Sequence, residues 1–270
     1  MILREVGLEE YKSILRDILF KIDDICRDNG IPYFLLAGTL LGAVRHEGFI
    51  PWDDDVDIAM KRKDYDKLAA IINSGDYGLV FIRPEDNLDT IYDYGKVCDT
   101  TTRVEELSFQ TVQGYGAFVD VFPFDSIPDD ETERKRLRRK YFNLQRLLTH
   151  ASKTSIPTNG FARRIAFLLT RPINAPKLAR WLNQQFREMN TGDTNWLGVP
   201  WMWHYPASLF SSTTDVRFEG RNLTTFSDPD KALRINYGDY MQLPPEEQRV
   251  CKHGLRCFIR EATEEDDAVE

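Results

Sequence analysis

The sequence predicts an α+β fold in which helices pack on a mixed β-sheet. Short apolar segments bounded by glycine and polar residues, which are typical of strands, recur along the chain. Between them lie longer segments whose apolar residues are three and four positions apart, which is typical of helices. The chain has 270 residues, of which 42% are hydrophobic, and this is enough for one large domain. We therefore expect a single mixed sheet with helices packed on it.

The first half of the chain alternates helices with strands. Apolar residues at helical spacing between Leu8 and Ile25 predict an amphipathic helix, which Asn29 and Gly30 would end. The elements predicted after it are a buried strand at 32–37, a short helix at 39–45, an acidic strand at 55–60, a helix at 63–73, and strands at 78–82, 91–98 and 117–122.

The segment that follows is helical in pattern and strongly basic. Between Arg134 and Arg180 there are 13 Lys or Arg residues and no Asp or Glu. Apolar residues at helical spacing predict helices from about 130 to 190, which we interpret as an insertion into the fold. We favour helices that face the core and expose a basic surface. The alternative is a peripheral membrane contact through 134–180, or a patch for an anionic polymer acceptor.

In the last third of the chain, the spacing of apolar residues indicates secondary structure less clearly. Residues 196–226 are rich in aromatic side chains and lack a clear period, so we expect irregular structure there. Asp228, followed by proline, would begin a helix that Gly238 ends. Residues 1–260 are expected to form a single domain, and the acidic residues 261–270 a disordered tail.

Composition argues against several functions. No apolar run approaches the roughly 20 residues that cross a bilayer, and the first residues lack the apolar stretch of a signal peptide. Four cysteines give no disulfide framework, so we expect a cytoplasmic protein with reduced thiols. The formal charge of −8 argues against general nucleic-acid binding.

Two aspartates in the acidic strand predict a metal site. Asp55 and Asp57 would share one face of the strand, with roughly 6–7 Å between their Cα atoms. Like charges at that distance are unfavourable unless a cation lies between them, and hard oxygen ligands select Mg²⁺ or Mn²⁺. Asp53 would join them if the strand extends back, although a turn after Pro51 is nearly as good an interpretation. A solvated strand end is the alternative, which the apolar surroundings weaken.

Two further features complete a predicted catalytic site. Gly38 and Thr39 open the short helix, and backbone N–H groups at such a turn bind phosphate. Asp120 is the acidic residue of an apolar strand, where a buried carboxylate needs a cation, a proton or a basic partner. Asp120 would therefore be a metal ligand or the base that takes a proton from the acceptor. We expect metal-assisted phosphoryl-type transfer, with the predicted catalytic residues Asp55, Asp57 and Asp120.

The string that begins at Gly38, GTLLGAVRHEGFIPWDDDVDIAM, resembles the LicD family, a branch of the nucleotidyltransferase superfamily that includes the fukutin-type proteins. The string YGDYMQLPP, which begins at Tyr237, is similar to the closing motif of that family. The resemblance covers about 30–253, with the basic middle poorly matched. It implies a nucleotidyltransferase-like mixed sheet in which a neighbouring strand carries a third carboxylate, a place that Asp120 matches.

Basic and aromatic residues supply candidate ligand contacts. Arg45 and Lys96 match basic positions of the family's pattern, so we expect both to bind phosphate, with an ion pair to the acidic cluster as the alternative. Arg103 is a weaker third candidate. A box for a quaternary ammonium such as choline is a second use of the aromatic residues, although ordinary core packing is the interpretation we favour. The candidate walls of such a box are Trp52, Tyr94, Trp201, Trp203 and Tyr205.

The resemblance implies a transferase that moves an alcohol phosphate from a CDP-activated alcohol, with CDP-choline favoured, to a glycan or lipid-linked glycan and releases CMP. The glycine turn and the basic residues would hold the diphosphate, and the carboxylates would hold Mg²⁺ or Mn²⁺. The alternatives are a true nucleotidyltransferase that releases pyrophosphate from a nucleoside triphosphate, a metal-dependent glycosyltransferase, and a binding module with a degenerate site.

Overall fold

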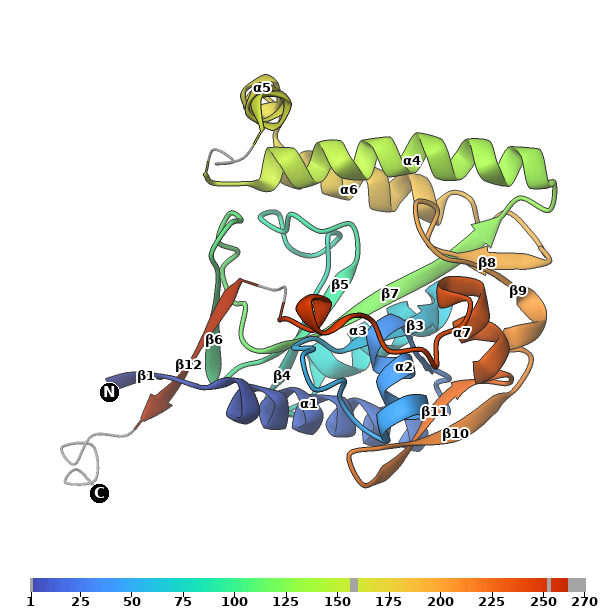
Figure 1. The fold of residues 1–270 in the computed structure, drawn as a ribbon, viewed down its shortest axis with the longest axis horizontal. Helices are drawn as coiled ribbons and strands as arrows, with labels where there is room; N and C mark the ends of the chain where they lie inside the picture. The colour runs from blue at the N-terminus through green and yellow to red at the C-terminus, as the bar shows by residue number, and fades with distance from the viewer. Residues whose placement is uncertain (1, 156–159, 252–253, 262–270) are drawn as a thin grey trace.

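In the computed structural model, which describes residues 2–155, 160–251 and 254–261, the core is a seven-stranded mixed β-sheet (Figure 1). This architecture confirms the predicted α+β class. The strand order is β2 (Phe34–Leu35), β3 (Asp57–Lys61), β7 (Phe118–Ile127), β5 (Gly95–Asp99) and β4 (Leu79–Ile82). The C-terminal end of β7 also pairs with β8 (Trp196–Gly198), which in turn pairs with β9 (His204–Pro206). Strands β3 and β7 run parallel, whereas the other neighbours are antiparallel.

Helices pack on this sheet because each has one apolar stripe. In α1 (Leu8–Asp28), the predicted helix, Leu15 and Ile22 are fully buried against β5 and β7. Helix α3 (Arg62–Ser74) packs on β3, β4 and β7, and α2 (Ala37–His46) packs on α7 (Pro229–Tyr237). Helix α7 begins and ends as predicted, because the Asp228 side chain accepts a hydrogen bond from the Lys231 amide and Gly238 has a φ of 64°.

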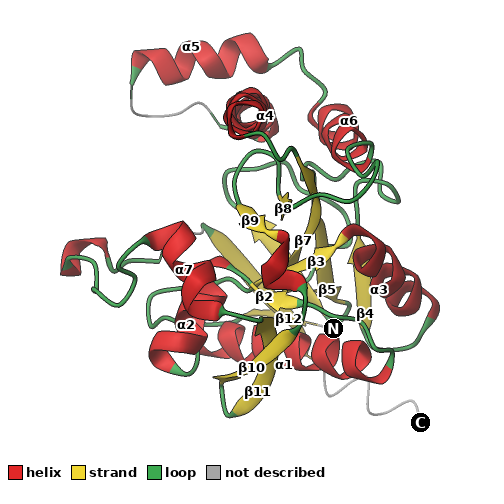
Figure 2. Cartoon of the chain, turned by 90° about the vertical axis from the view of Figure 1, so that its right-hand side faces the viewer, coloured by secondary structure: helices red, strands yellow, loops and turns green. Residues whose placement is uncertain are grey.

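The basic segment forms the predicted helical insertion. It contains α4 (Glu131–Ser152), α5 (Phe161–Thr170) and α6 (Ala175–Arg187). Helix α4 packs on α6 through Tyr141 and Phe186, whose ring centroids are 5.0 Å apart. Both views show α5 as the outermost element, beyond α4 from the sheet (Figures 1 and 2). Across the described residues, no helix has the combination of length and apolar character that a bilayer crossing requires.

The prediction of irregular structure at 196–226 is wrong. Besides β8 and β9, this region contains a short 3₁₀ helix, η1 (Ala207–Phe210), and an antiparallel hairpin of β10 (Thr213–Phe218) and β11 (Arg221–Phe226). The hairpin turn is Glu219-Gly220, with φ values of 48° and 85°. Two residues with positive φ match the twist of paired strands, but glutamate is an unusual choice at the first position. The turn therefore lacks the Asn-Gly or Asp-Gly signal that would have predicted a hairpin.

A second sheet joins the two ends of the described chain. Its strand order is β1 (Ile2–Glu5), β12 (Leu255–Glu261) and β6 (Thr102–Glu106), and all pairs are antiparallel. Three predicted strands also prove shorter than expected. The buried strand predicted at 32–37 comprises only Phe34–Leu35. The acidic strand begins at Asp57 rather than at 55, and the strand predicted at 91–98 begins at Gly95. The shortened strands leave acidic and aromatic residues in loops beside the sheet.

Candidate active site

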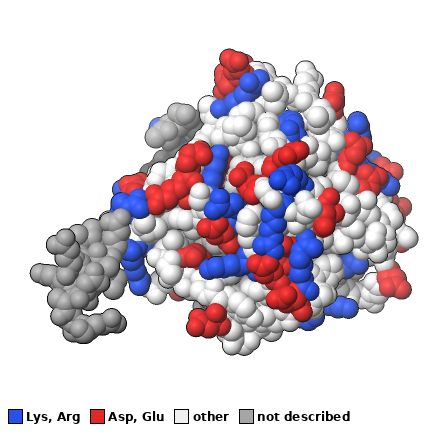
Figure 3. All heavy atoms as spheres, turned by 90° about the horizontal axis from the view of Figure 1, so that it is seen from below, with Lys and Arg blue, Asp and Glu red and all other residues white. Residues whose placement is uncertain are grey.

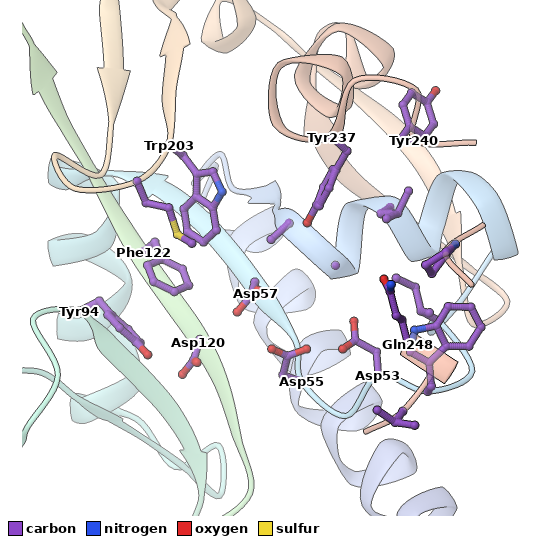
Figure 4. Close-up of a pocket in the computed structure, with 18 of the residues that line it drawn as sticks. Asp53, Asp55, Asp57, Tyr94, Asp120, Phe122, Trp203, Tyr237, Tyr240 and Gln248 are labelled. Carbon is purple, nitrogen blue, oxygen red and sulfur yellow. The ribbon is translucent and has the colours of Figure 1, made fainter. Parts of the chain in front are cut away.

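A cavity of about 1060 Å³ lies between the sheet, α2, α4 and the segment after α7 (Figure 4). One wall is acidic, a second is aromatic, and residues between Tyr237 and Val250 form a third, including Gln248 of the 3₁₀ helix η2 (Glu246–Gln248). A concave site of this volume, with polar groups converging on it, has the properties of a small-molecule site.

Four aspartates from two neighbouring stretches of chain form the acidic wall: Asp53, Asp55, Asp57 and Asp120. Asp57 begins β3 and lies opposite Asp120 in the parallel register with β7. Asp53 and Asp55 precede the strand, so the predicted shared strand face is wrong for Asp55 and Asp57. The loop nevertheless carries both carboxylates to the same side of the cavity as Asp57 (Figure 4).

The electrostatics of this wall disfavour a full set of negative charges. Burial raises the pKa of Asp57 well above its usual value, and the charges of Asp55, Asp120 and Asp53 raise it further. A cation or a proton shared among the carboxylates would relieve this repulsion. The wall therefore has the electrostatic character of a cation site.

The donor chemistry of the wall fits Mg²⁺ or Mn²⁺, because carboxylate oxygens are the hard ligands these ions prefer. As the side chains stand in the described part of the chain, however, no three His, Cys, Asp or Glu side chains are arranged to hold one ion. A coordination shell would therefore require side-chain rotation. Asp53 and Asp55 lie in a loop and are better placed for it than the strand residues Asp57 and Asp120.

Lys96, predicted to bind phosphate, contacts Asp120 instead of the cavity. It lies opposite Asp120 in the antiparallel register of β5 and β7, and its Nζ donates to Asp120 Oδ1 at 2.6 Å. The side chain is 2% exposed, and its ammonium lies over the ring of Phe118 at 3.6 Å and that of Tyr92 at 4.2 Å. The structure favours the alternative interpretation of Lys96, an ion pair with the acidic cluster.

The start of α2 joins the cavity to the acidic strand. Gly38 lines the cavity, and a Cβ at this position would lie 2.5 Å from Asp53 Oδ2, so only glycine fits without displacing Asp53. The hydroxyl of Thr39 points to the strand instead, where Thr39 Oγ1 accepts a hydrogen bond from the Asp57 amide at 2.8 Å. Ala37 has a φ of 47°, a strained value for a residue with a side chain, and such strain is found disproportionately at functional sites.

Of the three basic residues predicted to bind phosphate, Arg45 is the one that lines the cavity. Its guanidinium donates to the Tyr240 carbonyl at 2.9 Å, and burial and the charge of Arg249 lower its pKa. Two guanidinium groups that repel each other beside a cavity favour a bound anion. Arg103 is not brought to the site, because it lies exposed on β6 and pairs with Glu105.

Four of the five predicted aromatic residues line the cavity, namely Trp52, Tyr94, Trp201 and Trp203. Tyr205 is a correction, since it is 1% exposed, stacks on Phe124 and hydrogen-bonds to Asn236. Tyr205 belongs to the core, which agrees with the core packing that we favoured for the aromatic residues.

Phe122 and Tyr237 are among the residues of this cavity that sequence reasoning missed. Phe122 packs edge-to-face on Trp203 with centroids 5.1 Å apart, and Tyr237 points at the carboxylates (Figure 4). Burial, followed by the charge of Asp57, raises the pKa of Tyr237. The sequence could have predicted Phe122, because it lies two residues after Asp120 and every second side chain of a strand points to the same face of the sheet.

The site thus combines parallel strands with facing aspartates and the N-terminus of a helix. The family model "LicD/FKTN/FKRP, nucleotidyltransferase domain" matches residues 30–159. The lipopolysaccharide cholinephosphotransferase LicD of Haemophilus influenzae is 24% identical over 95% of this chain and 100% of its own length. Residues 30–159 of this chain form a domain of the LicD family.

Two rickettsial relatives match shorter stretches. The uncharacterized protein RP689 of Rickettsia prowazekii is 47% identical over 49 residues, which are 18% of each chain. The uncharacterized protein RT0683 of Rickettsia typhi is 41% identical over 58 residues, which are 21% of this chain and 19% of its own.

Proposed function

We propose that this chain is a phosphotransferase that moves phosphocholine from CDP-choline to a glycan or lipid-linked glycan, at the cytoplasmic face of the membrane, and releases CMP. The observation that carries the proposal is one cavity in which an acidic wall adjoins both a guanidinium and an aromatic wall. Similarity to a lipopolysaccharide cholinephosphotransferase over 95% of the chain supports the phosphocholine group and the glycan acceptor.

Two parts of the cavity suit two parts of the donor. The diphosphate would lie against the N-terminus of α2 and Arg45, where backbone N–H groups and a guanidinium favour an anion. The trimethylammonium of choline would lie against Phe122, Trp203 and Tyr94, since aromatic faces attract a cation that cannot donate hydrogen bonds. The rings of Tyr94 and Phe122 are 4.3 Å apart, so they offer one continuous surface.

The reaction is a displacement at the phosphorus that bears choline. The acceptor hydroxyl oxygen attacks that phosphorus, its proton passes to one of the carboxylates, and the bond to CMP breaks with its electron pair leaving on CMP. Bound by Asp53, Asp55, Asp57 and Asp120, Mg²⁺ or Mn²⁺ would neutralise charge on the diphosphate. Arg45 would orient the donor, and the Lys96 ammonium would keep Asp120 in place.

The test compares Asp57→Asn with the matched control Asp76→Asn, which changes an exposed aspartate in a turn. We expect the wild type and the control to release CMP from CDP-choline in the presence of Mn²⁺ and lipopolysaccharide. Asp57→Asn should lose CMP release while keeping its circular dichroism spectrum. CMP release at the wild-type rate by Asp57→Asn would refute the assignment of the acidic wall.

The identity of the product separates this activity from its alternatives. Pyrophosphate released from CTP or ATP, with no CMP from CDP-choline, would establish a nucleotidyltransferase instead. Turnover of a nucleotide-sugar would establish a glycosyltransferase.

A further inference from the structure

Helix α5 exposes an apolar stripe on its outer side. Phe161 is 80% exposed and Leu169 is 73% exposed, and Ile165 and Leu168 lie between them in the sequence and are also exposed. Positions 161, 165, 168 and 169 follow the i, i+4, i+7, i+8 spacing of one helix face. A stripe of four large apolar side chains on a ten-residue helix is far more than the scattered exposure of an ordinary surface.

The opposite face of α5 packs against the protein, which leaves the stripe facing outward. Phe167, 4% exposed, and Thr170 are buried on the side where α5 packs on α4. The helix is thus already anchored to the body of the protein through a different face. Both ribbon views place α5 outermost, with nothing drawn beyond it (Figures 1 and 2).

The segment that carries the stripe is basic. Its 13 Lys or Arg residues between Arg134 and Arg180 include Arg138 and Arg139 of α4 and Arg164 of α5, and these three side chains are exposed. On the face of the molecule seen from below, acidic and basic side chains are intermingled (Figure 3). Ion pairs such as Arg16–Asp17 neutralise charge on a mixed surface of this kind.

We propose that α5 and the basic surface of α4 dock on an anionic lipid bilayer, with α5 lying in the interface and its apolar stripe among the acyl chains. Ten residues span about 15 Å, which suits a helix that lies in the interface but is too short to cross a bilayer. Anionic lipid complements the basic surface, whereas a second copy of the chain would bring an identical basic surface against it. Charge complementarity therefore selects lipid as the occupant.

The docking site is connected to the cavity through α4. Residues Gln145, Leu148, Thr149 and Ser152 of that helix line the cavity, and α5 packs on the same helix. Docking would therefore hold the cavity close to the membrane surface. A lipid-linked acceptor would then have short access to the carboxylates, and this consequence rests on the proposed function. Membrane binding itself does not rest on the proposed function.

The experiment is vesicle flotation with the full chain. Vesicles of phosphatidylcholine with about 30% phosphatidylglycerol are compared with vesicles of pure phosphatidylcholine. We expect binding to the anionic vesicles that falls strongly in about 0.5 M salt. Leu168→Gln/Leu169→Gln should lower the partition coefficient about tenfold or more, because two leucines no longer enter the acyl region. The matched control, Leu3→Gln/Leu8→Gln, alters two exposed leucines near β1 and the start of α1 and should bind like the wild type.

Two further variants keep the outcome decisive. Phe161→Ser alters the most exposed residue of the stripe and serves if the double variant unfolds. Arg138→Glu/Arg139→Glu should lose binding to anionic vesicles with the stripe intact. Absence of binding by the wild type, or equal binding by all variants, would overturn the proposal. A dimer in solution that Leu168→Gln/Leu169→Gln converts to a monomer, without vesicle binding, would overturn it in favour of self-association.

Discussion

Asp93 makes the stability of this protein depend on pH. It precedes β5, is 2% exposed, and accepts a hydrogen bond from Trp201 Nε1 at 2.8 Å. Burial outweighs that hydrogen bond and raises the pKa of Asp93 from its usual 3.8 to about 6. Because the folded state holds the proton more tightly, the contribution of Asp93 is most favourable below pH 3.8 and is lost as the pH rises through about 6.

The magnitude follows from the two pKa values. The difference between 3.8 and about 6 corresponds to about 3 kcal/mol of stability lost by pH 8, where Asp93 is ionised in both the folded and the unfolded state. Asp93→Asn removes this loss and keeps an oxygen that can accept from Trp201. Its free energy of unfolding, relative to wild type, should therefore increase by about 3 kcal/mol between about pH 3 and about pH 8.

Urea denaturation followed by circular dichroism at both pH values measures this difference, and all other titrating groups cancel in the comparison with wild type. Asp76→Asn removes the same charge from an exposed turn and should show no comparable increase. An Asp93→Asn curve that stays parallel to wild type from low to high pH would show that Asp93 is not the buried carboxylate described here.

The remaining predictions concern residues around the cavity. Lys96→Met removes the ammonium 2.6 Å from Asp120 and should lower the free energy of unfolding by about 3 kcal/mol, whereas Lys96→Met/Asp120→Asn should recover part of the loss; a stable single variant would contradict the ion pair. Thr39→Val leaves the Asp57 amide without its acceptor and should cost about 1–3 kcal/mol in urea denaturation, while Thr39→Ser should cost little. Gly38→Ala should reduce CMP release several-fold with almost unchanged thermal stability, because its methyl group displaces the Asp53 carboxylate; unchanged turnover would show that Asp53 is dispensable. Trp203→Leu should raise KM for CDP-choline about tenfold and leave KM for CDP-glycerol nearly unchanged, and an equal effect on both donors would exclude Trp203 as a choline contact.

The sequence alone determined the elements whose signals are local. Helix α1 follows from its apolar period, and α7 from a cap, a proline and a terminal glycine, all within a few residues of the helix. The sequence also marks Asp57 and Asp120 each as a carboxylate in an apolar strand, whereas the expectation that the two meet came from the resemblance to the LicD family. Patterns of this kind are readable because their physical cause lies next to them in the chain.

Tertiary structure decided which distant residues face each other. Lys96 contacts Asp120 because antiparallel pairing sets β5 against β7 in one register, and a shift of one residue would turn its side chain to the opposite face of the sheet. Tyr205 lies in the core because β9 places it on Phe124, and β1 pairs with β12 across more than 250 positions. Such contacts gain their energy only after the sheet has assembled, so no short stretch of sequence carries their signal.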